Sequence, residues 1–430
     1  MLNIYEYKSK ECLDFLSKLE VRAKAASPEI VGAVTEIIEN VKQTGDEAVV
    51  EYTKRFDKAE LDVNSLELHK SELEKAAKLV PDDLYKTMER AAKNIFAFHE
   101  KQKRQSFVCF DEAGKITGQR IRPVKRAGIY VPGGSAAYPS SVLMNCIPAK
   151  VAGVSEIIMT TPMRDGKIPP AVAAAALIAG VDRVFTVGGA QAIAALAYGT
   201  QTIPRVDVIA GPGNIYVATA KRLVYGACDI DMIAGPSEVL VIADKNANAK
   251  FIAADLLSQA EHDKLASSLL LCDNIQLAQE VDRQLSQQLA KLERNEIATA
   301  SIISYGAAIV CENLDEAASL ANEIAPEHLE LLVENPVAFF PKIENAGSVF
   351  LGEYSPEPLG DYFAGPNHVL PTNGTARFSS PLSVDTFTKK MGYMCFDKQG
   401  LCDYKDDIIS FAMSEGLSAH ANSVKTRFED

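Results

Sequence analysis

The sequence predicts an α/β fold made of two Rossmann-like, doubly wound domains, with an N-terminal helical segment and a C-terminal helical tail. Three observations support this fold. Between residues 127 and 351, short apolar runs alternate with stretches of helical periodicity. The apolar runs are almost continuously hydrophobic, as in parallel strands that are buried on both faces. Several of them end in glycine-containing turns, which are typical of connections from strand to helix.

The composition is that of a soluble globular protein. The chain has 430 residues, of which 47% are hydrophobic and 23% charged, and this is enough for two large domains with appendages. A formal net charge of -13 argues against nucleic-acid binding. There is no signal-peptide pattern and no apolar run long enough for a membrane span, so we expect a cytoplasmic protein. The eight cysteines contain no C-x-x-C pair, which favours reduced thiols.

The N-terminal part of the chain carries no visible chemistry. Residues 1–25 predict one short charged helix, and Ser27-Pro28-Glu29 begins the next helix with a serine cap and a proline at the first helical position. We interpret His69 and His99 as solvated helix residues, because neither has a partner nearby in the sequence. Residues 107–124 predict a β-hairpin with its turn at 111–114.

The first α/β series begins at Ala127 and contains three glycine turns after predicted strands. These are Val131-Pro132-Gly133-Gly134, Val187-Gly188-Gly189-Ala190-Gln191 and Ala210-Gly211-Pro212-Gly213-Asn214. Glycine permits a close backbone approach, and the following helix presents main-chain N–H groups to a pyrophosphate. The G-x-G-x-x-G fingerprint is not met, because Tyr216 stands where the third glycine belongs. A nucleotide site and ordinary βα turns therefore both remain open.

A second α/β series follows the run 231–238, with strands expected at 239–243, 268–272, 307–311 and 347–351. Gln259 and His262 lie at the end of its first helix, three residues apart, so both side chains are expected on one face. An amide oxygen and a neutral imidazole nitrogen can together bind a divalent metal. The spacing alone is weak, because a histidine at a helix end is more often a surface or capping residue.

Three further segments combine acids with imidazoles. Glu327 and His328 are adjacent and follow a proline, and the loop 359–368 is dense in Asp, Gly and His. Glu415 and His420 lie between two short predicted helices. Such loops are functional-site candidates, although solvated acid–imidazole pairs are common by chance.

Together, the run 231–238, the Gln259/His262 pair, Glu327-His328, the loop 360–368 and Glu415/His420 resemble the histidinol dehydrogenase family. The match extends along almost the whole chain, in order and with matching spacing. Members of this family oxidise L-histidinol to L-histidine in two NAD-dependent steps of histidine biosynthesis, with a bound zinc ion.

The resemblance implies a role for each candidate residue. One zinc ion per subunit would be bound by Gln259, His262, Asp361 and His420. Glu327 and His328 would be the acid/base pair. NAD would contact Tyr130, Gln191 and Asn214. L-histidinol would contact Ser237, Gln259, His262, His328, Asp361, His368, Glu415 and His420.

The resemblance also implies an intertwined homodimer, in which the tail of one subunit completes the site of its partner. We predict an N-terminal helix at 1–25 and a first α/β domain formed by 26–126 and 238–382, which carries most of the metal and acid/base residues. An NAD-binding α/β domain at 127–237 and a tail at 383–430 complete the chain. Nucleic-acid and membrane partners are not expected.

Other functions are compatible with parts of this pattern. A related zinc- and NAD-dependent dehydrogenase could oxidise another polar amino or sulfonated alcohol. A zinc hydrolase could use Glu327 as its base, but the sequence has no H-E-x-x-H motif. A non-catalytic metal-binding scaffold would leave the acid–imidazole pairs unexplained. Covalent catalysis by cysteine is disfavoured, because no cysteine neighbours the candidate residues in the sequence.

Overall fold

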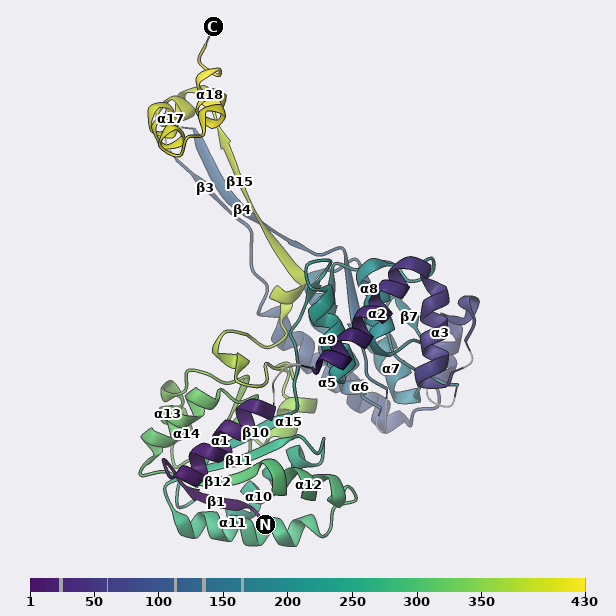
Figure 1. Ribbon diagram of the computed structural model, residues 1–430, viewed down its shortest axis with the longest axis vertical. Coiled ribbons are helices and arrows are strands. Elements are labelled where there is room, and N and C mark those ends of the chain that lie inside the picture. Colours follow the sequence, from purple (N-terminus) through teal and green to yellow (C-terminus); the bar gives the residue numbers. More distant parts are fainter. Residues whose placement is uncertain (23–25, 60, 112–113, 134–136, 164–165, 430) are drawn as a thin grey trace. The chain divides into compact units, whose positions relative to one another are not determined.

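The computed structural model describes residues 1–22, 26–59, 61–111, 114–133, 137–163 and 166–429. The chain divides into two compact units: unit 1 comprises Met1–Gln102 and Val124–Phe387, and unit 2 comprises Lys103–Pro123 and Thr388–Asp430. Unit 1 contains two six-stranded sheets, each built mainly from parallel strands with helices packed on both faces (Figure 1). The predicted α/β class with doubly wound sheets is confirmed.

The first sheet, here called the β5 sheet, has the strand order β2-β7-β6-β5-β8-β9. All its pairs are parallel except β2 with β7. Its strands are β2 (Glu67–Leu68), β5 (Arg126–Tyr130), β6 (Glu156–Thr160), β7 (Arg183–Phe185), β8 (Val208–Ala210) and β9 (Asp229–Ile230). One face packs on α4 (Lys70–Ala77), α5 (Asp82–Glu100), α6 (Pro139–Ala152) and α7 (Pro170–Ala179). The other packs on α2 (Pro28–Thr44), α3 (Asp46–Asp57), α8 (Gly189–Tyr198) and α9 (Ile215–Val224).

The second sheet, here called the β10 sheet, is entirely parallel, with the order β1-β12-β11-β10-β13-β14. Its strands are β1 (Asn3–Glu6), β10 (Glu238–Ala243), β11 (Ser267–Cys272), β12 (Gly306–Val310), β13 (His328–Leu332) and β14 (Ser348–Leu351). One face packs on α10 (Ala249–Ala260), α11 (Ile275–Leu289) and α12 (Asn295–Tyr305), and the other on α1 (Lys10–Arg22), α13 (Leu314–Ile324) and α14 (Pro336–Phe339).

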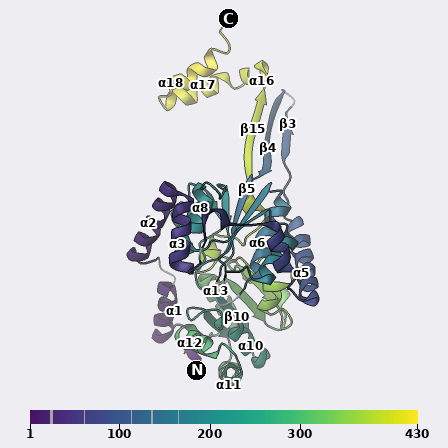
Figure 2. The same ribbon diagram turned by 90° about the vertical axis from the view of Figure 1, so that its right-hand side faces the viewer.

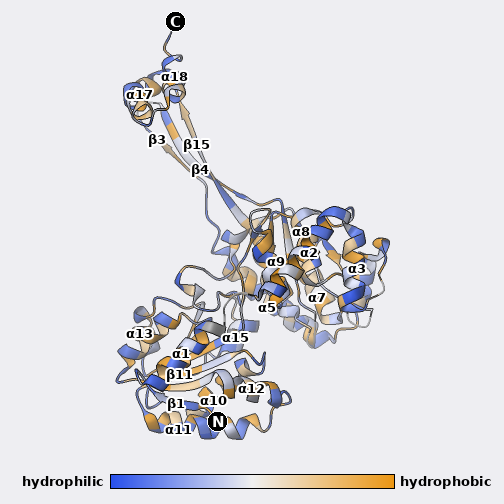
Figure 3. Ribbon diagram, viewed as in Figure 1, coloured by the Kyte–Doolittle hydropathy of each residue, from blue (hydrophilic) through white to orange (hydrophobic). Residues whose placement is uncertain are grey.

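Amphipathic helices cover the β10 sheet because its strands are hydrophobic on both faces. All six residues of β10 are buried. Figure 3 shows hydrophilic and hydrophobic residues mixed along α11, as expected for a helix with one apolar stripe facing the sheet. That stripe consists of Leu277, Ala278, Val281, Leu285 and Leu289.

Three expectations for the N-terminal part of the chain are wrong. The expected helix at 1–25 begins only at Lys10, and the residues before it form the strand β1. The hydrogen-bonding partner of β1 is β12, about 300 residues away in the sequence (Asn3 opposite Ala307). Residues 26–102 pack mainly on the β5 sheet and not on the β10 sheet, because α2 to α5 bury their apolar stripes against the β5 sheet. His99 is fully buried, with Nδ1 2.8 Å from the Ile95 oxygen. Residues 23–25 lie outside the described part of the chain.

Unit 2 is built on a three-stranded antiparallel sheet in the order β15-β4-β3 (Figures 1 and 2). The predicted hairpin is confirmed as β3 (Phe107–Phe110) and β4 (Lys115–Pro123), although 112 and 113 of its turn lie outside the described residues. The tail adds β15 (Thr388–Phe396), which was not predicted, and then α16 (Lys398–Cys402), α17 (Lys405–Ser414) and α18 (Ser418–Lys425). None of the described helices has both the length and the apolar character that crossing a bilayer requires.

Candidate active site

The candidate acid/base and metal-binding residues of unit 1 gather at the amino ends of strands in the β10 sheet. Ser237 immediately precedes β10, His262 precedes β11, and Glu327 and His328 stand at the start of β13. In a doubly wound sheet a ligand is expected beyond the carboxyl ends of the strands, and the three glycine turns of the β5 sheet lie at such ends. The candidate site of the β10 sheet therefore lies at the opposite, amino ends of the strands.

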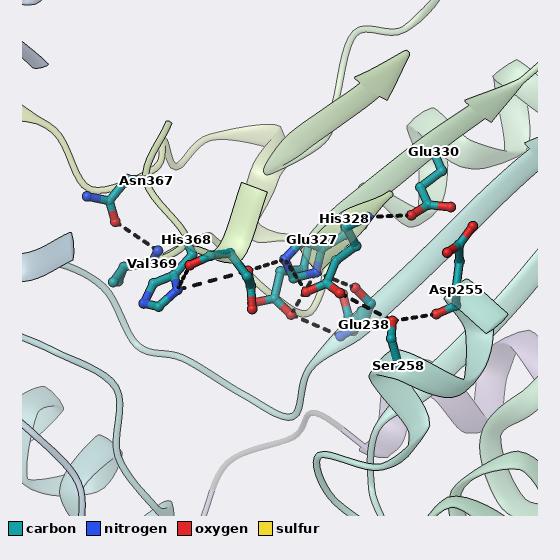
Figure 4. Close-up of polar contacts among 11 residues, drawn as sticks. Glu238, Asp255, Ser258, Glu327, His328, Glu330, Asn367, His368 and Val369 are labelled. Atoms are coloured by element: carbon teal, nitrogen blue, oxygen red, sulfur yellow. Dashed lines mark hydrogen bonds and ion pairs between the residues drawn. The ribbon is translucent and has the colours of Figure 1, made fainter. Parts of the chain in front are cut away.

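Glu238 braces the acid/base pair with its main chain (Figure 4). Its N–H donates to Glu327 Oε2 at 2.9 Å, and its oxygen lies 2.9 Å from His328 Nδ1. This arrangement follows from the parallel pairing of β10 and β13, in which Val239 stands opposite His328. Glu327 and His328 are both buried, and the distance from Glu327 Oε2 to His328 Nδ1 is 3.7 Å.

The other ring nitrogen of His328 faces two carboxylates. Nε2 lies 3.7 Å from Asp361 Oδ1 and 3.9 Å from Glu357 Oε1, and it has no hydrogen-bond partner among the described residues. Both acids belong to the short helix α15 (Glu357–Tyr362), where a spacing of four residues places them on one face. One ligand atom from each of His328, Glu357 and Asp361 lies within 4.8 Å of the others, so this group could hold a metal ion.

Gln259 and His262 differ in position and exposure. Gln259 is on α10 with 1% of its surface exposed, and its Oε1 has no hydrogen-bond partner among the described residues. The helix ends at Ala260, so His262 is not helical as expected; it lies in the turn that follows, where its N–H donates to the Gln259 oxygen at 3.1 Å. His262 is exposed, although partial desolvation lowers its pKa and the nearby Asp361 opposes this shift.

His368 lies against Asp361 from the predicted loop. Its Nδ1 is 3.0 Å from the main-chain oxygen of Asp361 and 4.0 Å from Oδ1. The loop is held by its neighbour Asn367, whose Nδ2 donates to the Met144 oxygen at 2.6 Å and lies 3.3 Å from His99 Nε2. The buried His99 thus supports the loop that carries His368.

The electrostatics of the site follow from burial and from the close packing of charges. Burial raises the pKa of Glu327 to about 8. Burial alone would lower the pKa of His328, but the Glu327 and Asp361 carboxylates outweigh it and raise this pKa to about 10. Burial and the neighbouring Asp361 raise the pKa of Glu357 to about 8. Burial acts against ionisation of Asp361 too, but the imidazoles of His328 and His368 hold its pKa at about 2. The site therefore combines an ionised carboxylate with protonated neighbours.

Sequence reasoning missed the acids that support these groups. Glu330, 1% exposed on β13, accepts the N–H of Glu357 at 2.8 Å and so holds the start of α15. Burial and the nearby Asp255 carboxylate raise the pKa of Glu330. Ser258 donates to Glu357 Oε2 at 3.2 Å. Glu357 was detectable, because it precedes Asp361 by one helical turn; Glu330 was not, because nothing local distinguishes a buried acid in a strand from a solvated one.

The structure connects the three glycine turns of the β5 sheet. The Tyr130 hydroxyl accepts the Gly189 N–H at 3.2 Å, which links the end of β5 to the start of α8. A Cβ on Gly211 would lie 2.0 Å from the main-chain oxygen of Tyr130, so the third turn packs directly on the main chain of Tyr130. Gln191 is buried, and neither of its amide atoms has a hydrogen-bond partner among the described residues. Gly134 of the first turn lies outside the described residues.

Three predicted residues have less structural support. Ser237 is partly buried, and its main-chain oxygen accepts the Ser267 N–H at 3.0 Å. Glu415 and His420 belong to unit 2, where both are exposed. The structure brings together Glu327, His328, Asp361 and His368; the participation of Glu415 and His420 stays a prediction.

Comparison with known proteins shows the family of the chain. The sequence model of the family described as histidinol dehydrogenase matches residues 20–428. The chain is 52% identical to histidinol dehydrogenase from Bacillus cereus over 98% of both chains, and 49% identical to that from Lactococcus lactis over 100% of both. A crystal structure of histidinol dehydrogenase from Elizabethkingia anophelis, 39% identical, superposes with a TM-score of 0.93 over 99% of this chain and 98% of that one. The chain belongs to the histidinol dehydrogenase family and is thus an oxidoreductase.

Proposed function

We propose that this chain catalyses the zinc-dependent, NAD-linked four-electron oxidation of L-histidinol to L-histidine through the aldehyde, in histidine biosynthesis. Family membership supports the substrate. The observation that carries the chemistry is the cluster of Glu327, His328 and Asp361, in which an imidazole nitrogen with no hydrogen-bond partner in the described part of the chain faces an ionised carboxylate. Such a cluster can bind a cation and transfer protons at one place.

The residues present fit a divalent cation. Gln259 Oε1, His328 Nε2 and Glu357 Oε1 are buried polar atoms without hydrogen-bond partners among the described residues. Buried polar atoms are costly unless they are paired; a cation would satisfy Gln259 Oε1, while His328 Nε2 is left for the substrate proton. We propose that Gln259, His262 and Asp361 bind one zinc ion per subunit together with the partner's His420. Bound zinc would supply a positively charged template that orients histidinol.

His328 would accept the proton of the substrate hydroxyl. Its Nδ1 is held by the Glu238 oxygen, so Nε2 is the nitrogen that is free to act as a base. Because the ring is buried and braced, its orientation is set before substrate binds. The proton passes to Nε2 as the hydride leaves the carbinol carbon.

Glu327 would activate the water that attacks the aldehyde. One of its oxygens accepts the Glu238 N–H, which fixes the carboxylate next to His328. Burial raises its pKa, and a desolvated carboxylate is a stronger base than an exposed one. The hydrate that forms then loses the second hydride. Ser237, His368 and the partner's Glu415 would hold the polar groups of the substrate.

NAD would be held by the turns of the β5 sheet, and two NAD molecules bound one after the other would each accept one hydride. The buried amide of Gln191, which has no hydrogen-bond partner among the described residues, offers a donor and an acceptor. Asn214 accepts from Tyr216 N and Val217 N and so caps α9, whose first turn is adjacent to the nucleotide turn. Burial raises the pKa of Tyr130 to about 12, so its hydroxyl stays neutral.

The partner in this proposal is a second copy of the chain. Unit 2 has many exposed large hydrophobic side chains, among them Phe107, Phe110, Met394, Phe411 and Met413. Apolar surface of this kind is typical of a subunit interface. A homodimer in which Glu415 and His420 enter the partner's site would cover it and complete the zinc ligands.

The test is the absorbance of NADH at 340 nm when L-histidinol and NAD are added to the zinc-loaded protein. The proposal predicts two NADH per histidinol and a loss of activity after chelation that zinc restores. A relative that oxidises another polar amino or sulfonated alcohol is the alternative, and a higher kcat/KM for such an alcohol than for histidinol would favour it.

A further inference from the structure

A fully buried ion pair in the β5 sheet is not used by the proposed chemistry. Lys221 on α9 and Asp231, directly after β9, form an ion pair between side chains that are 2% and 0% exposed. Two buried charges need strong compensation, because each loses the hydration that it has in water. The neighbours of the pair show how it is compensated.

Both charges hold the same residue, Gly211. Lys221 Nζ donates to the Gly211 oxygen at 2.9 Å, and Asp231 Oδ2 accepts the Gly211 N–H at 2.8 Å. Asp231 Oδ1 also accepts the N–H of Met232 at 2.6 Å. Side chains on helices lean toward the helix N-terminus, which lets Lys221 reach back along α9 to the turn before it. The ion pair thus binds both the main-chain N–H and the main-chain oxygen of Gly211.

Gly211 is also the residue of this turn that is hardest to replace by another amino acid. Its φ is +122°, in the region that favours glycine, and a Cβ would collide with the main-chain oxygen of Tyr130. The turn ends at Asn214, which caps α9. The position of Gly211 therefore determines how the turn meets Tyr130 and where the first N–H groups of α9 point.

We infer that Lys221 and Asp231 are positioning residues for NAD, which hold the turn 211–214 in the conformation that receives the dinucleotide. The inference rests on the proposed function. Buried ion pairs contribute little net stability compared with apolar residues of the same size, so stability alone does not account for this one. A role in fixing the main chain of a nucleotide-binding turn does account for this ion pair, because a small displacement of such a turn weakens binding strongly.

Asp231 adds a second constraint. It lies at the start of the segment that runs from β9 to Ser237, and it holds both Gly211 and Met232. Farther along, the Gly235 N–H donates to Thr372 Oγ1 at 2.7 Å. The pair thus ties the nucleotide turn to the segment that leads into the candidate substrate residue Ser237.

The experiment compares the zinc-loaded wild-type enzyme with the double variant Lys221→Met/Asp231→Asn, which removes both charges and leaves no uncompensated one. NAD affinity is measured by isothermal titration calorimetry, and KM values are measured for both substrates. We expect Kd and KM for NAD to rise about tenfold or more. The KM for histidinol and kcat at saturating NAD should change less than about twofold, since the residues around His328 are untouched.

The matched control is Arg126→Met/Glu156→Gln. This removes an ion pair of 2.5 Å between β5 and β6, at the amino ends of the same sheet and away from the glycine turns. It should leave NAD affinity unchanged. If the double variant at Lys221 and Asp231 unfolds by circular dichroism, Lys221→Gln/Asp231→Asn carries the same expectation, because it also removes both charges and keeps a polar side chain at both positions.

The outcomes separate the inference from the function on which it rests. Wild-type protein that binds no NAD would overturn both. Wild-type protein that binds NAD, with equal affinity in the folded variant, would overturn the inference alone. A variant in which the KM for histidinol rises as much as the KM for NAD would also overturn it, because the effect would then be a general loss of structure.

Discussion

His328 Nδ1 lies 2.9 Å from the main-chain oxygen of Glu238, so the opposite nitrogen, Nε2, faces Asp361 and Glu357. A carbonyl oxygen can only accept, and Nδ1 must therefore carry a proton in this contact. The neutral ring then has its lone pair on Nε2, inside the site. The parallel pairing of β10 with β13 thus selects the tautomer that can act as a base.

The pH dependence of the reaction follows from this pair. Only the neutral ring can accept the substrate proton, and the pKa of His328 is raised to about 10, against burial, by the Glu327 and Asp361 carboxylates. We expect kcat/KM for histidinol to rise from pH 7 toward pH 10. Glu327→Gln removes one negative charge and should move this rise to lower pH. The pH–rate profiles of both proteins test the sign, and a profile that is unmoved in the variant would contradict the assignment.

The two half-reactions should separate in Glu327→Gln. The variant lacks the carboxylate that activates water, while His328 remains to accept the hydroxyl proton. Oxidation of histidinal should therefore slow by about a hundredfold or more, and oxidation of histidinol to the aldehyde should change much less. Stopped-flow measurement with each substrate distinguishes the steps. Equal losses in both would show that Glu327 does not act in the second step alone.

Much of the fold was predictable, because buried parallel strands and their helices have clear local patterns. The predicted strand bounds 239–243 and 268–272 differ by one residue from those of β10 and β11. The edge strand β1 was missed because its hydrogen bonds come from β12, far away in the sequence. Strand β15 was missed for the same reason: its nine residues are mostly exposed and are stabilised by β4.

The motifs of the site were predictable from the sequence, whereas the buried residues that hold them in place were not. The location at the amino ends of the β10 sheet could have been inferred, since Ser237 and His262 both precede predicted strands. Glu330 and Lys221 could not, because a buried charge in a strand or helix differs from a solvated one only through distant partners such as Asp255 and Asp231. His99 was misinterpreted as solvated for this reason too: its partner Asn367 lies 268 positions away.

Metal binding should depend on Gln259. The side chain is buried, and its Oε1 has no partner among the described residues, so Gln259→Leu keeps a similar volume and removes the amide that carries the ligand atom. We expect zinc affinity to fall about tenfold to a hundredfold, measured by competition with a chromophoric chelator. Gln287→Leu, on the exposed side of α11, is the control and should bind zinc normally. Unchanged affinity in Gln259→Leu would exclude it as a ligand.

The buried His99 should make the protein less stable in mild acid. Burial lowers the pKa of His99, while in the unfolded chain this pKa is about 6.5. Below pH 6.5 the unfolded chain binds a proton at His99 that the folded protein does not bind. The contribution of His99 to the free energy of unfolding is therefore fully present above this pH and is lost as the pH falls toward the pKa of the folded state. His99→Gln should show a smaller drop in Tm between pH 7.5 and pH 5.5 than the wild type. His69→Gln, at an exposed position, should not.

Complementation between inactive variants should reveal whether the active site is shared. In the proposed homodimer, each site takes His262 from one subunit and His420 from the other. His262→Asn and His420→Asn should each be inactive alone. In a heterodimer of the two, one site carries both substitutions and the other carries neither. Random association of equal amounts makes half of the dimers mixed, each with one intact site of two, so the coexpressed variants should regain about a quarter of wild-type activity. If each chain supplied its own His420, mixing would restore nothing, and the tail would belong to the site of its own subunit.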